Sequence, residues 1–224
     1  TDQQTTYPGK ELEALSVAVN YHRWIVSRIA PYLGDTVAEV GAGVGSVSLL
    51  LLENNVGRLV AFEPSNNMYP LLAENLAHEN RAVPVNDFFS GRHAPQGFDS
   101  VIYINVLEHI DDDRAELGRA FDALKPGGHL VLFVPALAWL YSDFDRQIGH
   151  FRRYTRSGLS GLVGDVGFTV LEARYFDVAG IIPWYLYFVL LRKSIGAGSV
   201  SLYDKVVVPV MRVVERVVPA RWLH

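Results

Sequence analysis

The chain has 224 residues, half of them hydrophobic, which is enough for one α/β domain with a full core. Its formal net charge of −4 argues against nucleic acid as a partner, because nucleic-acid-binding surfaces are basic. The absence of cysteine excludes disulfides and thiolate metal sites, and it agrees with a cytoplasmic location. The start lacks the plan of a signal peptide, and the longest uncharged apolar stretch, 178–191, is too short to span a bilayer as a helix.

A glycine-rich turn follows the first predicted strand. Residues 10–32 have apolar side chains at helical spacing and predict a helix, and the strand at 36–40 comes next. Gly41-Ala42-Gly43-Val44-Gly45 then leads into a helical pattern over 44–53. Strand, glycine turn and helix begin a nucleotide-binding βαβ unit, where glycine lets the backbone approach a ligand closely. A tight turn with no ligand is the alternative interpretation.

Two acidic residues support the binding interpretation. Glu39 interrupts the apolar strand just before the turn, and a buried carboxylate needs a cation or donor nearby. Glu63 ends the next strand, 58–62, at a spacing from Gly41 that lets a carboxylate hold both ribose hydroxyls. Ser46 stands where a dinucleotide fingerprint requires its third glycine, which argues against an NAD-linked oxidoreductase.

The rest of the chain continues to alternate strands and helices. Strands are predicted at 83–85, 100–104, 129–134 and 168–176, and helices at 68–79, 111–124 and 155–166. The apolar run at 100–104 is what a strand buried on both faces requires. We therefore predict a Rossmann-like doubly wound, mostly parallel sheet with helices on both faces, over residues 36–177.

Five segments in order carry a family resemblance. They are Glu-Val-Gly-Ala-Gly-Val-Gly (39–45), Phe-Glu-Pro-Ser (62–65), Asn-Asp-Phe (86–88), Asn-Val-Leu-Glu-His-Ile (105–110) and Leu-Lys-Pro-Gly-Gly (124–128). Over about residues 20–177 the chain resembles the class I S-adenosylmethionine (SAM)-dependent methyltransferases. The resemblance implies SAM as the cofactor and an N-terminal region, 1–35, that covers its site.

The same resemblance implies a set of cofactor-binding residues. They are Glu39, Gly41, Ala42, Gly43, Glu63, Pro64, Asp87, Phe88 and Asn105. Asp87 would accept a hydrogen bond from the adenine amino group while Phe88 lines the ring, and Asn105 would border the methionine part. Alternatively, Asp87 is a surface acid that caps a turn. His109 is either a general base or a structural histidine.

The segment 136–157 is predicted to be the substrate loop. Its pattern Asp145-x-x-x-Gly149-His150-Phe151-Arg152-Arg153-Tyr154 resembles a methyltransferase subgroup, some members of which are encoded beside or fused to glycosyltransferases. That association suggests a sugar or glycolipid acceptor, and the family suggests natural-product or glycan biosynthesis.

Methyl transfer to oxygen depends on positioning and gains from a base near neutral pKa. His150 is the predicted base, oriented by Asp145 or Asp143. The predicted acceptor-binding residues are Tyr141, Arg152, Arg153, Tyr154 and Trp184, the arginines because guanidinium groups suit phosphate and carboxylate. Alternatively, the acids and arginines of this loop form ion pairs that hold it over the site. No metal is predicted, although Asp143, Asp145 and His150 could ligate Mg²⁺.

The C-terminal region, 178–224, is predicted to be an apolar helical extension with segments at 181–193 and 202–218, the second kinked at Pro209. The resembled family ends with an antiparallel strand, for which residues 219–224 are short, so either the sequence is trimmed or that strand is absent or replaced. The apolar segments would cover the sheet edge, enclose the acceptor or form a homodimer. Contact of 178–218 with a membrane surface through its basic residues is the alternative.

The sequence thus predicts an O-methyltransferase for a small-molecule, sugar or glycolipid acceptor. A catalytically silent SAM-binding scaffold or partner subunit is the rival interpretation, because an intact binding turn does not by itself establish turnover.

Overall fold

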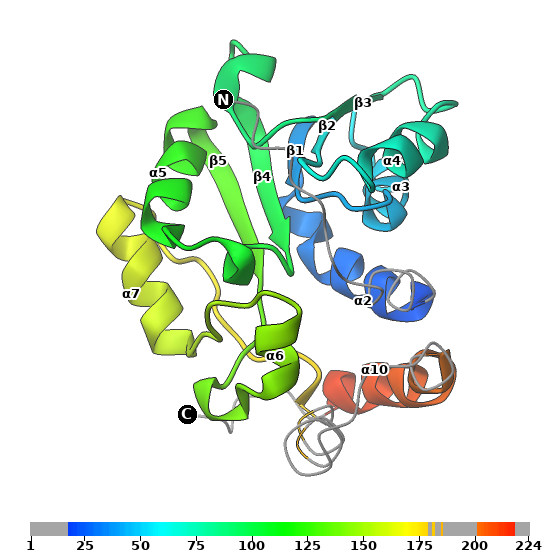
Figure 1. Ribbon diagram of the computed structural model, residues 1–224, viewed down its shortest axis with the longest axis vertical. Coiled ribbons are helices and arrows are strands. Elements are labelled where there is room, and N and C mark those ends of the chain that lie inside the picture. The colour runs from blue at the N-terminus through cyan, green and yellow to red at the C-terminus, as the bar shows by residue number, and fades with distance from the viewer. Residues whose placement is uncertain (1–17, 179–180, 182–184, 186–200, 218–224) are drawn as a thin grey trace.

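The computed structural model describes residues 18–178, 181, 185 and 201–217. Its centre is a five-stranded parallel sheet with the strand order β3-β2-β1-β4-β5 (Figure 1). The strands are β1 (Thr36–Val40), β2 (Arg58–Phe62), β3 (Ala82–Val85), β4 (Phe98–Ile104) and β5 (Leu124–Phe133). The order reverses direction between β1 and β4, as in a doubly wound sheet, so the predicted fold class is confirmed.

Helices cover both faces of this sheet. The α-helices in the described part of the chain are α2 (Val19–Ile29), α3 (Ser46–Leu52), α4 (Tyr69–Asn75), α5 (Asp113–Ala123), α6 (Asp143–Gln147), α7 (Arg156–Val166) and α10 (Val208–Val217). In Figure 1, α5 and α7 lie on one side of the sheet and α2, α3 and α4 on the other. Helix α6 and the short 3₁₀ turn η3 (Leu107–His109) lie near the ends of β4 and β5.

The core consists of two apolar clusters, one on each face. In β1, Val37 packs with α2 and α3 residues while the next residue, Ala38, packs with α5 on the other face. Neighbouring residues of β2, Leu59 and Val60, divide in the same way. Successive side chains of a strand point to opposite faces, and both faces are covered here. This double burial explains why these strands are nearly continuous apolar runs in the sequence.

The predicted sixth strand at 168–176 is wrong. These residues form no strand in the structure, and the side chain of Leu171 is 67% exposed. A strand needs a hydrogen-bonding neighbour, and a cavity lies between β5 and this segment, because Leu132 of β5 and Leu171 both line it. The sequence has strand composition here, and Phe176 packs against Phe133 of β5, but the segment forms no strand beside β5.

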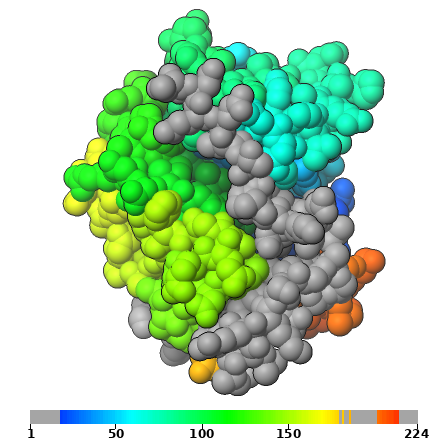
Figure 2. Space-filling model, in the orientation of Figure 1, coloured from blue at the N-terminus to red at the C-terminus, as the bar shows by residue number. Residues whose placement is uncertain are grey.

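The C-terminal segment is anchored to the N-terminal helix. Its π-helical turn η7 (Tyr203–Val207) runs directly into α10, so the helix changes from π to α type next to Pro209, where a break or kink is predicted. The buried carboxylate of Asp204 accepts hydrogen bonds from the backbone N–H groups of Asn20 (3.2 Å) and Tyr21 (2.8 Å), at the first turn of α2. Helix α10 consequently lies beside α2, and residues 201–213 form part of the molecular surface (Figure 2). Of the predicted helix at 181–193 only residues 181 and 185 are described, so this helix and Trp184 lie outside the part of the chain that can be compared.

No helix in the described part of the chain is both long and apolar enough to cross a membrane.

Candidate functional site

The glycine turn between β1 and α3 forms one wall of a cavity of about 1440 Å³. Gly41 and Gly43 have left-handed backbone angles, with φ of +69° and +58°. A Cβ on Gly41 would lie 2.5 Å from Cγ2 of Val106, whereas a Cβ on Gly43 would meet no atom within 4 Å. Gly41 is therefore required by packing, while Gly43 leaves open space where a ligand can approach the backbone. Ala42 lines the same cavity.

Two buried carboxylates organise this turn. Glu63 accepts hydrogen bonds from the N–H groups of Gly43 (2.8 Å) and Ser65 (2.8 Å). Glu39 lines the cavity and accepts a hydrogen bond from the hydroxyl of Ser48 at 2.5 Å, which confirms the predicted donor near this acid. Burial raises the pKa of Glu39 to about 8. The Ser48 partner could not be read from the sequence, because Ser48 follows the turn by several residues.

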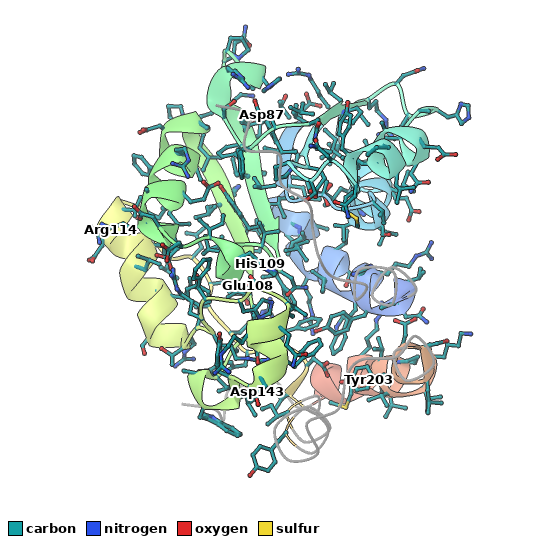
Figure 3. All side chains as sticks on the ribbon, in the orientation of Figure 1. Asp87, Glu108, His109, Arg114, Asp143 and Tyr203 are labelled. Atoms are coloured by element: carbon teal, nitrogen blue, oxygen red, sulfur yellow. The ribbon has the colours of Figure 1, made fainter. Side chains whose placement is uncertain are left out.

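The residues predicted near the adenine have local partners. Asp87 accepts a hydrogen bond from the N–H of Phe88 (2.8 Å) and pairs with Arg92, which is the turn-capping arrangement. Phe88 is 54% exposed. Glu63, Pro64, Asp87 and Phe88 are absent from the described lining of the cavity, whereas Asn105, at the end of β4, belongs to it. Figure 3 shows Asp87 well apart from Glu108 and His109. The cofactor roles of Asp87 and Phe88 thus stay predictions.

On the other side of the cavity, four residues form what we call the acid–histidine cluster: Glu108, His109, Asp145 and His150. Nδ1 of His150 lies 3.0 Å from Oδ1 of Asp145, and Nε2 of His150 lies 3.8 Å from Oε1 of Glu108. The rings of His109 and His150 meet edge to face, with centroids 4.6 Å apart. Figure 3 shows Glu108 and His109 together between the end of β4 and α6.

Backbone hydrogen bonds hold the two halves of the cluster together. The N–H of Phe151 donates to the carbonyl of Glu108 (2.8 Å), and the N–H of His150 donates to the carbonyl of Asp145 (2.9 Å). The first bond ties η3 to the loop after α6, so residues far apart in sequence meet. The sequence predicted that Asp145 or Asp143 orients His150, but it did not predict Glu108 as their neighbour. No local pattern links the segment that contains Glu108 with the loop that contains His150.

Asp145 is the most heavily hydrogen-bonded acid of the cluster. It accepts from the N–H (2.8 Å) and hydroxyl (2.9 Å) of Ser142, and from Nε of Arg153 (2.8 Å). Burial alone would raise the pKa of Asp145, but the bonds from His150 and Arg153 outweigh burial and lower this pKa below its usual range. Asp145 is consequently ionised at neutral pH.

Burial shifts Glu108 and His109 of this cluster toward their neutral forms. It raises the pKa of Glu108 to about 8 and, together with the charge of His150, lowers the pKa of His109 to about 4. The side chain of Glu108 is fully buried, and neither carboxylate oxygen has a hydrogen-bond partner.

The remaining residues of the predicted substrate loop are mainly engaged within the protein. The ion-pair interpretation is confirmed for Asp145 and Arg153, whereas Arg152 pairs with Asp113 (2.7 Å) and Asp143 pairs with Arg146 (2.8 Å). The hydroxyl of Tyr141 donates to the carbonyl of His150 (2.6 Å).

Tyr154 is buried, and its hydroxyl donates to Asp113 (3.0 Å). Both Tyr154 and Arg153 line the cavity. The acceptor-binding roles predicted for these residues stay predictions.

A doubly wound sheet whose first strand ends in a glycine turn, with a cavity at the carboxyl ends of the strands, defines an α/β protein that binds a nucleotide-like cofactor. Residues 21–173 match the family described as "Methyltransferase domain", and the chain belongs to that family. This membership argues against the alternative interpretation of the chain as an NAD-linked oxidoreductase.

Curated relatives include both uncharacterised proteins and named enzymes. An uncharacterised methyltransferase of Geobacillus kaustophilus (strain HTA426) is 30% identical over 126 residues, covering 55% of this chain and 57% of the relative. A ubiquinone biosynthesis O-methyltransferase of Xylella fastidiosa (strain 9a5c) is 28% identical over 131 residues, covering 56% and 50%. The chain spans about half the length of most of the curated relatives it matches.

Solved structures share the fold. A phosphoethanolamine N-methyltransferase 2 of Haemonchus contortus, in complex with phosphomonomethylethanolamine and S-adenosylhomocysteine, has a TM-score of 0.62 at 18% identity. That alignment covers 86% of this chain and 49% of the other. A SAM-dependent methyltransferase from Archaeoglobus fulgidus has a TM-score of 0.57 at 15% identity, with 71% and 73% covered.

Proposed function

We propose that this protein, whose family uses SAM as methyl donor, transfers the methyl group to a hydroxyl oxygen of a small-molecule, sugar or glycolipid acceptor. The observation that carries the proposal is the pair formed by Asp145 and His150, 3.0 Å apart, at the same cavity that the glycine turn lines. An ionised acid on Nδ1 is the arrangement that makes the other ring nitrogen a proton acceptor.

The turn fits the cofactor. The open space above Gly43, the left-handed turn and the cavity-lining Glu39 and Asn105 provide a backbone surface and polar groups for the nucleoside and amino-acid parts. SAM supplies an electrophilic methyl group: the S–CH₃ bond breaks with its electron pair left on sulfur as the O–CH₃ bond forms. The protein's contribution is to align the two reactants and to keep water out.

The acceptor's proton has a defined destination. Asp145 accepts Nδ1–H of His150, so the lone pair of Nε2 is available to take the proton from the hydroxyl as the new bond forms. A neutral alcohol is a poor nucleophile at neutral pH, so this removal is the step that an oxygen acceptor needs most. The ubiquinone relative methylates oxygen and the phosphoethanolamine relatives methylate nitrogen, so the choice of oxygen here rests on the histidine–acid pair.

The cavity favours an acceptor with an extended part. Its volume of about 1440 Å³, part of which SAM would occupy, exceeds the roughly 300–1,000 Å³ of ordinary small-molecule pockets. It extends from the glycine turn past β5 to Tyr203 and Asp204 of the C-terminal segment. A glycolipid would fill such a cavity better than a free sugar.

The C-terminal segment supports a membrane-surface contact. Leu202, Val206, Val210 and Val213 follow one another at roughly helical spacing, and each is more than half exposed. We call these four residues the apolar stripe. The exposed Lys205 and the partly exposed Arg212 add positive charge in the same segment, which suits anionic lipid headgroups. We therefore propose an anionic bilayer surface as the partner of this stripe.

Activity is tested with radiolabelled SAM and a panel of acceptors that includes free sugars, glycolipids, phenols and amines. The expected result is an O-methylated product whose formation falls by about 100-fold or more in His150→Ala. His78→Ala is the matched control, because His78 is an exposed histidine outside the cavity. Binding of S-adenosylhomocysteine without turnover on any acceptor would favour the silent scaffold, and an N-methylated product would overturn the choice of oxygen.

A further inference from the structure

Three potential metal ligands meet at the acceptor side of the cavity. One ligand atom from each of Glu108, His109 and His150 lies within 4.8 Å of the other two, and no other such group occurs among the described residues. Around a divalent ion with bonds of about 2.1 Å, neighbouring ligand atoms are about 3.0–3.4 Å apart. Small side-chain rotations would therefore close the three groups around one ion.

Glu108 provides an independent reason to expect a cation. Its carboxylate is fully buried in the cavity wall, and neither oxygen has a hydrogen-bond partner. Arg153, whose charge acts on Glu108, forms its ion pair with Asp145 (2.8 Å). A buried carboxyl group without a partner in another residue is costly whether it is ionised or neutral, and metal coordination is one of the few ways to satisfy it.

The two histidines are oriented for coordination. Asp145 holds Nδ1 of His150 at 3.0 Å, which turns Nε2 toward Glu108. A ring nitrogen of His109 is held by the backbone of Gly149. In metalloproteins, a carboxylate or a backbone carbonyl on the far nitrogen fixes the tautomer and orientation of a ligating histidine in this way. Each imidazole is therefore held by a hydrogen-bond partner in the way that metal-ligating histidines are.

We propose that Glu108, His109 and His150 bind one divalent transition-metal ion. Two imidazoles and one carboxylate suit Zn²⁺, Mn²⁺, Fe²⁺ or Co²⁺, whereas Mg²⁺ prefers an all-oxygen set. The site differs from the Mg²⁺ alternative considered from the sequence, because Asp143 pairs with Arg146 and Asp145 lies behind His150 as its support.

The ion would act on the same acceptor. This consequence rests on the proposed function, although binding of the ion does not. With the ion bound, Nε2 of His150 is a ligand rather than a base, and the acceptor hydroxyl can occupy an open position on the cavity side. Coordination makes a hydroxyl more acidic, so it can release its proton to water before the acceptor is enclosed with SAM. The metal-free and metal-loaded protein would thus activate the acceptor in different ways.

Metal binding is measured directly on the full chain, after treatment with EDTA and removal of the chelator. Zn²⁺ is titrated in competition with a chromophoric indicator, and Co²⁺ is titrated by its visible d–d absorption. We expect one ion per chain and a Co²⁺ spectrum of a low-coordinate nitrogen–oxygen site. Affinity should fall by about tenfold or more in His109→Ala, His150→Ala and Glu108→Gln, and stay unchanged in His78→Ala.

The proposal is overturned if the wild-type protein binds no ion, or if His109→Ala and His150→Ala bind it as tightly as the wild type. Each variant is titrated with S-adenosylhomocysteine in the same buffer, because retained binding there identifies a folded protein. A wild-type chain that binds metal but not S-adenosylhomocysteine would refute the proposed function and leave the metal site standing.

Discussion

At the scale of single residues, Gly41 and Gly43 of the turn have different roles: packing requires a glycine at 41, whereas the space at 43 is open to a ligand. Gly41→Ala places a Cβ against Val106 in a left-handed conformation, so we expect a loss of about 1–3 kcal/mol of stability. In Gly43→Ala the only cost is the strain of a left-handed alanine, because the new Cβ meets no protein atom within 4 Å. This variant should lose less stability but bind S-adenosylhomocysteine at least about tenfold more weakly. Thermal unfolding and calorimetric titration of both variants measure the two effects.

Gly118→Ala in α5 is the control for this pair, since its Cβ also meets no atom and its φ is ordinary. Equal cofactor affinity for Gly43→Ala and the wild type would mean that the ligand does not approach the turn.

The raised pKa of Glu39, about 8, implies a pH dependence of stability. The folded protein keeps a proton on Glu39 that the unfolded chain has already lost above pH 4.5, so this group's stabilisation disappears as pH rises to 8. The raised pKa of Glu108 likewise makes stability fall as pH rises. The lowered pKa of His109 makes stability rise with pH, but only below pH 6.5. Between pH 6.5 and 8 only the acids contribute, and stability of the ligand-free protein should fall.

Glu39→Gln cannot lose a proton and keeps an acceptor for Ser48. As pH rises from 6.5 to 9, the free energy of unfolding of Glu39→Gln should increase relative to that of the wild type by on the order of 1–2 kcal/mol. Urea unfolding measures this difference. A constant difference across that range would show that Glu39 is already ionised in the folded protein.

At the scale of elements, the N-terminus of α2 depends on a residue from the other end of the chain. Ala18 offers no side-chain cap, and Asp204 supplies it through the N–H groups of Asn20 and Tyr21. Asp204→Ala should cost about 1–2 kcal/mol by thermal unfolding, whereas Asp204→Asn keeps an acceptor and should cost less. Asp165→Ala, which removes an exposed ion pair with Arg114, should change little. If Asp165→Ala lowers stability as much as Asp204→Ala does, the hydrogen bonds of Asp204 to α2 have no special role.

Strands with both faces buried were the elements that the sequence predicted best. The predicted bounds of β1 and β2 agree with the structure, because apolar runs next to turn residues have few other solutions in an α/β fold. The segment 168–176 has similar composition, but strand formation depends on a partner that composition does not reveal. In the site, Asp145 and His150 are only five residues apart, so their pairing could be predicted from the sequence. The contacts of Glu108 with His150 and of Asp204 with α2 depend on tertiary packing and could not be predicted.

At the scale of the whole molecule, the cavity connects the glycine turn with the segment that has the apolar stripe. Tyr203 and Asp204 line the cavity, and the neighbouring Leu202 and Val206 face outward. If the stripe lies on a bilayer, the C-terminal end of the cavity is near the lipid surface. An acceptor with a lipid part could then enter without crossing bulk water, which agrees with the glycolipid class proposed for the acceptor.

This arrangement predicts binding to anionic vesicles. The protein should co-sediment with vesicles that contain phosphatidylserine, and less with pure phosphatidylcholine, because Lys205 and Arg212 add attraction to anionic headgroups. The double variant Val206→Glu, Val210→Glu should bind at least about tenfold more weakly, because it places two charges where exposed apolar side chains would enter the bilayer. Leu71→Glu, at an exposed apolar residue on α4, is the matched control and should bind like the wild type. If the wild type ignores both vesicles and light scattering instead detects a dimer that the double variant abolishes, the stripe is a homodimer interface and the membrane proposal fails.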